Sequence, residues 1–163
     1  MPAKVCKRGV VSDDGPEGQT PGALLAQAGL ALGEAILDAL APWAEWQAVR
    51  LGGATLSADG RRAGEEIANA AAPLLAALLA ADVDSQRGTP LTILRKVHLP
   101  LTEMLLARGV APAPRDPADV AAQPDDVFAV APRSFSDLGP EVHEAGLRWG
   151  VTKAFAHRAR HQR

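Results

Sequence analysis

The chain has 163 residues, a formal net charge of −2 and one cysteine, Cys6. This length suits a single domain with a tail, and it is too short for two comfortable domains. Ala and Leu account for 33 and 20 residues, whereas Tyr is absent and Phe and Ile occur three times each. Strong helix formers therefore outweigh the residues that suit a pleated surface, which argues against a sandwich, a barrel or a doubly wound sheet.

Charge and cysteine content narrow the class of protein further. A net charge near zero gives no global electrostatic reason to bind nucleic acid or an anionic membrane. A single cysteine cannot form an internal disulfide, which favours the cytosol, and 13 Arg against 4 Lys indicates a GC-rich bacterial source. The longest uncharged stretches, 18–33 and 67–81, are shorter than the roughly 20 strongly apolar residues of a membrane span. The sequence therefore predicts no transmembrane helix.

The first predicted elements are a disordered tail over residues 1–19 and a helix that opens a single helical domain over 20–163. The tail mixes charges with glycine and has no apolar period. Thr20 followed by Pro21 is typical of an N-cap with proline at the first helical position. Apolar residues then recur along one helical face until Gly52-Gly53, and Pro42 is predicted to kink this helix.

A second helix is predicted after a cap at Ser57 or Asp59, with a bend at Pro73. Its predicted buried face comprises Ala63, Ile67, Ala70, Leu74, Leu78 and Ala81.

A third helix is predicted from the Thr89-Pro90 cap to Gly109. Apolar residues and one histidine recur at alternating spacings of three and four, which is typical of the seam of a bundle helix. The seam comprises Leu91, Leu94, His98, Leu101 and Leu105, and Pro100 interrupts it.

The helical period fails over 110–133, where prolines alternate with charged residues, and this predicts one long Pro-rich loop. Within it Val127, Phe128 and Val130 suit a short extended piece or a docking turn.

A last helix is predicted from Pro140, with Ser136 or Asp137 as candidate caps. Two apolar faces run along it: one comprises Val142, Ala145, Trp149, Thr152 and Ala156, and the other Leu147, Val151 and Phe155. An apolar surface this wide predicts a helix buried between others. Trp43, Trp46 and Trp149 are expected in the core. The predicted architecture is all-α, an irregular bundle of four to five Pro-kinked helices.

His98 is the first candidate site residue, because a histidine on an apolar seam must find a hydrogen bond or face a pocket. One interpretation is a core histidine bonded to a backbone carbonyl that Pro73 or Pro100 leaves unpaired. The alternative is a ligand pocket that His98 lines together with Glu103 and two acids of the Pro-rich loop, Asp125 and Asp126.

The second candidate site is the basic C-terminal end. Residues 112–147 carry a net charge of −5 and residues 148–163 carry +5. Cations suit a helix C-terminus and anions its start, which explains this polarity without any partner. The alternative is a handle for an acidic partner or for phosphates, formed by Arg158, Arg160, His161 and Arg163.

Recognisable catalytic motifs are missing: there is no Gly-x-Ser-x-Gly, Walker loop, His-Glu-x-x-His or Cys-x-x-Cys. Glu141, His143 and Glu144 do not give the Glu-x-x-His spacing of a di-iron bundle, so no metal and no cofactor are predicted. The sequence favours a non-enzymatic interaction or regulatory protein of the cytosol that binds a protein partner or itself. The alternatives are a small ligand-binding protein or enzyme with a pocket near His98, and nucleic-acid or ribosome association through the basic C-terminus.

Overall fold

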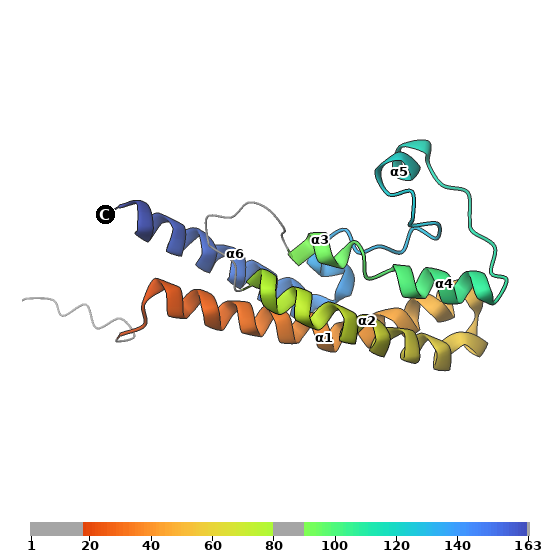
Figure 1. Ribbon diagram of the computed structural model, residues 1–163, viewed down its shortest axis with the longest axis horizontal. Helices are drawn as coiled ribbons and strands as arrows, with labels where there is room; N and C mark the ends of the chain where they lie inside the picture. The colour runs from red at the N-terminus through yellow and green to blue at the C-terminus, as the bar shows by residue number, and fades with distance from the viewer. Residues whose placement is uncertain (1–17, 80–89, 163) are drawn as a thin grey trace, which may run out of the picture.

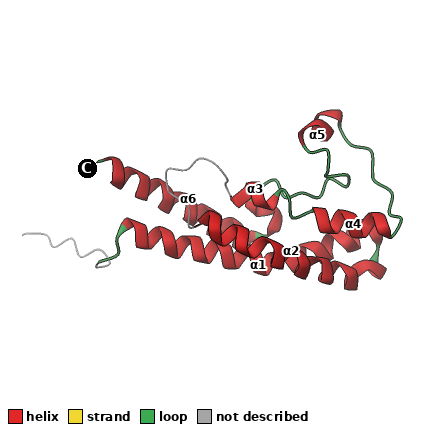
Figure 2. Cartoon of the chain, in the orientation of Figure 1, coloured by secondary structure: helices red, strands yellow, loops and turns green. Residues whose placement is uncertain are grey.

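The computed structural model describes residues 18–79 and 90–162, and every regular element among them is helical (Figure 1, Figure 2). The prediction of an all-α fold is confirmed. The predicted tail lies outside the described residues except for Gly18 and Gln19. The helices are α1 (Pro21–Gly52), α2 (Ser57–Leu79), α3 (Pro90–Leu94), α4 (Leu99–Ala107), α5 (Pro117–Ala122) and α6 (Pro140–His161), with 3-10 turns η1 (Ala54–Leu56) and η2 (Phe135–Leu138).

Helix α1 begins and ends where the sequence predicts. The Thr20 hydroxyl accepts a hydrogen bond from the Ala23 N–H at 3.2 Å, and Pro21 needs no N–H partner in the first turn. Gly53 ends the helix at φ 86°, a left-handed conformation that glycine adopts without steric cost. The helix runs through Pro42 as one element of 32 residues, so the kink predicted there is not confirmed.

By length and apolar composition alone, α1 is also long enough to cross a bilayer. In this fold its core face, Leu32, Ile36 and Leu40, is fully buried against other helices. Core helices of soluble proteins can have the same length and apolar composition as a membrane span. The prediction that the chain lacks a membrane-spanning helix therefore stays a prediction.

Helices α1 and α2 form an antiparallel hairpin joined by η1 (Figure 1). Two glycines one turn apart on α2 bring the backbones into close contact. A Cβ added at Gly60 would lie 2.7 Å from the Glu45 Cα, and one added at Gly64 would lie 2.3 Å from the Ala41 Cα. Because real side chains do not approach this closely, only glycine at these two positions permits the observed packing.

The glycine contacts set which face of α2 is buried, and this face differs from the predicted one. The buried residues are Gly60, Ala63, Gly64, Ile67, Ala71 and Leu75. Ala70 and Leu74, both predicted to be buried, are exposed. Ser57 already has helical φ and ψ values, so it starts α2 rather than capping it, and a bend at Pro73 is not confirmed.

The predicted third helix is two helices. Residues 95–98 form a turn between α3 and α4, and Pro100 occupies the first turn of α4. Proline fixes φ and lacks an N–H, so it favours a helix start over a helix interior. Of the predicted seam, Leu94, His98, Leu101 and Leu105 are buried and Leu91 is half-buried, so the seam continues across the break.

Helix α6 runs antiparallel to α1 and covers its N-terminal half (Figure 1). The Trp149 indole lies over Gly29, where an added Cβ would be 3.8 Å from its Nε1. Trp43 is buried and Trp149 half-buried, as predicted. Trp46 is 59% exposed with the Arg50 guanidinium 5.4 Å from its ring centre, so the prediction of a core position was wrong for this residue.

Candidate functional site

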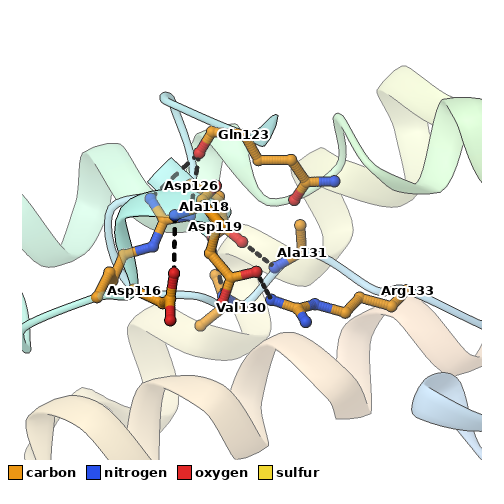
Figure 3. A network of polar contacts seen from close by, with 9 residues as sticks. Asp116, Ala118, Asp119, Gln123, Asp126, Val130, Ala131 and Arg133 are labelled. Atoms are coloured by element: carbon orange, nitrogen blue, oxygen red, sulfur yellow. Dashed lines mark hydrogen bonds and ion pairs between the residues drawn. The ribbon is translucent and has the colours of Figure 1, made fainter. Parts of the chain in front are cut away.

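Residues 110–133 were predicted to form one long Pro-rich loop, and the structure shows a loop interrupted by one helical element. This element is the short helix α5, which the Asp116 carboxylate caps by accepting the Ala118 N–H at 2.7 Å (Figure 3). At the other end of α5 the Arg115 guanidinium donates to the carbonyl oxygens of Asp119 and Gln123 at 3.0–3.1 Å. A helix of six residues is unstable alone, so these side-chain bonds to its ends hold it in place.

Asp126 closes the turn that follows α5. It is 2% exposed, and its two carboxylate oxygens accept hydrogen bonds from the N–H groups of Val130 and Ala131 at 2.8 and 3.0 Å (Figure 3). The turn carries Phe128 and Val130 into the core, at 5% and 3% exposure, as the predicted docking turn requires. A buried carboxylate that is satisfied by backbone donors is a structural group.

Two further acids organise the approach to α6. Asp119 forms an ion pair with Arg133 at 3.2 Å (Figure 3). Asp137 accepts the N–H groups of Arg133 and Ser134 at 2.7 and 2.9 Å, and with Ser134 it forms a capping box around η2. Ser134 therefore caps η2. The N-cap position of α6 is occupied by Gly139, so the prediction that Ser136 or Asp137 caps the last helix was wrong.

Of the four residues predicted to line a ligand pocket, only Glu103 lines any of the three grooves described in this subsection. His98 is 4% exposed, and its Nδ1–H donates to the Arg95 carbonyl at 2.6 Å. Asp125 is exposed, while Asp126 is committed to its own turn. Glu103 lines a groove of about 330 Å³ between α2 and α4, together with Asp59, Arg62 and Glu66. The ligand-pocket hypothesis stays a prediction, and the placement of these residues gives it no support.

His98 retains one unusual feature. Its Nε2 and the hydroxyl of Thr102, one turn later, are buried and have no hydrogen-bond partner among the described residues. Neither residue lines the groove that holds Glu103 or either of the two apolar grooves described below. The hydrogen bond to the Arg95 carbonyl is of the type that the first interpretation expects, a core histidine held by a backbone oxygen.

The basic residues at the end of α6 are exposed to solvent. Arg158, Arg160 and His161 lie in its last turn, and Arg163 lies outside the described residues. The His157 and His161 rings are 4.5 Å apart, centre to centre. No cluster of three or more metal-ligating side chains occurs within residues 18–79 and 90–162.

Two other grooves are apolar. One, of about 380 Å³, lies between α1 and α2 and includes Leu30, Leu37 and Leu79. The other, of about 250 Å³, lies between α2 and the α3–α4 turn and has Lys96 at its edge. No residue of 110–139 lines either groove or the α2–α4 groove, so the Pro-rich segment covers none of the three.

Helix α6 has an apolar face that is open to solvent, although the sequence predicted a helix buried between others. That prediction of burial was wrong for this face. Val142 and Ala156 are buried against the body of the protein, as predicted for the first apolar face. The second face is open to solvent: Leu147 is 58%, Val151 70% and Phe155 47% exposed. These three residues, at spacings of four, are named the α6 stripe. Their apolar pattern was visible in the sequence, but nothing in it showed that the face would be uncovered.

Comparison with protein-family models, with curated proteins and with solved structures gives no match to this chain.

Proposed function

We propose that this protein is a non-enzymatic interaction protein of the cytosol, and that it docks through the α6 stripe. The observation that carries the proposal is the exposure of Leu147, Val151 and Phe155 on one line of a helix whose opposite face is buried. Contiguous exposed apolar residues typically mark interaction surfaces in soluble proteins. Burial of each such side chain contributes about 1.5–3 kcal/mol, so an uncovered stripe favours a partner.

The polar residues of the chain support a binding role over catalysis. The carboxylates of Asp116, Asp126 and Asp137 bond to nearby backbone N–H groups, which stabilises local turns. None of the three grooves described above is lined by a serine, a cysteine or a histidine. The alternatives, a pocket enzyme and a nucleic-acid protein, have no comparable observation behind them.

Site-specific photocrosslinking in the native cells tests the proposal. A photoreactive residue replaces Val151 in one variant and Leu30 in another, and these positions are equally exposed at 70% but lie on different helices. We expect covalent protein adducts at position 151 that disappear in the presence of a second change, Phe155→Glu. Absence of adducts at position 151, or equal adducts at both positions, would overturn the α6 stripe as the docking surface.

A further inference from the structure

We propose that the partner of the α6 stripe is the α6 stripe of a second copy of this chain, with the two helices antiparallel. This inference rests on the proposed function and specifies its partner. The stripe runs along the exposed face of a helix of 22 residues, and the charges at the two ends of the stripe are opposite in sign. A surface with this order of charges is complementary to itself only when one copy is reversed.

The helical spacing places five residues on one line. Glu144 lies three residues before Leu147, and Arg158 lies three residues after Phe155, so both charges continue the α6 stripe at its ends. Pairing about a two-fold axis at Val151 brings Leu147 against Phe155 of the second copy. The same axis brings Glu144 against Arg158 of the second copy. Both ends of the interface thus receive one apolar contact and one ion pair.

Charge excludes the parallel arrangement. Parallel pairing would set Glu144 against Glu144 and Arg158 against Arg158, and like charges across an interface are repulsive. It would also align the two helix dipoles unfavourably, whereas reversed helices set each positive N-terminal end beside a negative C-terminal end. Glu144 is 74% exposed while it contacts Arg148 at 3.0 Å, so its carboxylate keeps open surface for a second cation.

Small side chains beside the stripe permit close approach. Gly150 and Ala154 are exposed, and a Cβ added at Gly150 would meet nothing within 4 Å. Within the chain, Gly60 and Gly64 already use the same four-residue spacing to bring α2 against α1. Since only one helix per copy contributes, the buried area is at the small end of specific interfaces, and we expect a dimer with a roughly micromolar dissociation constant.

Sedimentation of the full chain over a wide concentration range measures the pairing. We expect the mass to rise from monomer to dimer. Val151→Glu places two carboxylates on the two-fold axis and should keep the protein monomeric at every concentration. Leu30→Glu introduces the same charge at an equally exposed apolar position on α1 and should leave the dimer unchanged. Far-UV circular dichroism of each variant verifies that the helices remain.

Charge reversal tests the orientation. Glu144→Arg alone and Arg158→Glu alone should each weaken dimerisation about tenfold, because each creates two like-charge contacts, and tenfold corresponds to about 1.4 kcal/mol. The double variant recreates both ion pairs with exchanged signs and should recover most of the loss. Additive weakening in the double variant would overturn the antiparallel arrangement.

Cysteine pairing gives an independent measure of orientation. In a Cys6→Ser background, Leu147→Cys and Phe155→Cys chains should each form little disulfide alone. The mixture should form a disulfide between the two variants on oxidation. Rapid disulfide formation within the Leu147→Cys sample alone would indicate a parallel pair and overturn the proposal.

The outcomes separate this inference from the function on which it rests. A chain that is monomeric at every concentration, yet forms adducts at position 151 with a different protein in cells, overturns the self-pairing and leaves the docking function standing. Adducts that join position 151 to residues 1–17 of the same chain overturn both. Binding to phosphatidylglycerol–phosphatidylethanolamine vesicles that is abolished by Val151→Glu would also overturn both proposals. The α6 stripe would then bind a lipid surface and not a protein.

Discussion

Asp126 and His98 are both buried polar side chains, but they differ in how many of their polar atoms have a hydrogen-bond partner. Both carboxylate oxygens of Asp126 accept backbone N–H groups, and these bonds span a turn in which Ala129 has a φ of 54°. A non-glycine residue with positive φ is held there by its surroundings. His98 has only its Nδ1 bonded, with Nε2 buried and unpaired among the described residues. Asp126 therefore stabilises a specific backbone path, whereas His98 acts chiefly through packing.

Replacement of Asp126 by alanine should destabilise the protein strongly, because the N–H groups of Val130 and Ala131 lose their acceptors inside the fold. Each buried donor left unsatisfied costs about 1–3 kcal/mol. Urea unfolding measures the loss, and Asp126→Asn should lose less because its amide oxygen replaces one acceptor. The neighbouring exposed Asp125→Ala is the control and should change stability by less than about 0.5 kcal/mol. Equal effects at the two positions would contradict the structural role.

At the scale of elements, the backbones of α1 and α2 approach each other closely at two glycines. Gly60 and Gly64 of α2 face Ala41, Ala44 and Glu45 of α1. Contact between backbones excludes water without large side chains, which suits a chain so rich in alanine. The bulky core residues, Leu32, Ile36 and Leu40 on α1, fill the space where the other helices meet.

Gly64→Ala should destabilise the protein although alanine favours helix. The added Cβ would lie 2.3 Å from the Ala41 Cα, and this backbone atom cannot move away. Overpacking of this kind costs about 1–3 kcal/mol, more than the roughly 1 kcal/mol that alanine contributes through helix propensity. The matched control is Gly150→Ala, where an added Cβ meets nothing and should stabilise by about 0.5–1 kcal/mol. Thermal unfolding of dilute samples compares the two, and stabilisation by both changes would contradict the close approach.

The existence of the long helices α1, α2 and α6 was predictable from local signals, but the buried face of a helix was predictable only in part. The Thr20-Pro21 cap and Gly53 stop bound α1 as expected, because capping depends on neighbouring residues. On α2 the burial of Ala71 rather than Ala70 follows from the glycine contacts with α1, a tertiary feature that alanine periodicity does not encode.

The candidate site shows the same division between local and tertiary information. The spacing of Leu147, Val151 and Phe155 identifies an apolar line, but periodicity gives no information about whether another element covers it. For the Pro-rich segment, Asp116-Pro117 is the same cap-and-proline signal as Thr20-Pro21, but α5 was missed because no apolar period follows it and the Arg115 bonds that hold it reach up to eight residues away. No sequence period records such a contact.

At the scale of the whole molecule, α1 joins the other long helices into one body. It contacts α2 along the hairpin and α6 over its N-terminal half, while α4 packs at the far end (Figure 1). The turn that carries Phe128 and Val130 joins the same buried cluster as Leu40 and Leu101. A shared core predicts that these parts unfold together.

Cooperative unfolding is therefore expected for the Trp46→Phe variant, which lacks the exposed indole and keeps Trp43 and Trp149. Trp43 reports on the core of α1, and Trp149 reports on the contact between α6 and Gly29. In a urea titration of the dilute protein, tryptophan fluorescence and far-UV circular dichroism should give coincident transitions. A fluorescence transition at clearly lower urea would mean that α6 separates first, which would contradict a single domain.

The order of the helices along the chain has a consequence for synthesis on the ribosome. The α1–α2 hairpin is contiguous and precedes α6, so it emerges before α6 and its two helices meet with little loop to close. The surface of α1 around Gly29 contacts Leu79 of α2, but Trp149 covers it only after residues 140–161 have emerged, when more than half of the chain has followed α1. A translating or prematurely terminated chain thus presents apolar surface that chaperones and proteases bind, and completion of α6 is the step that removes it.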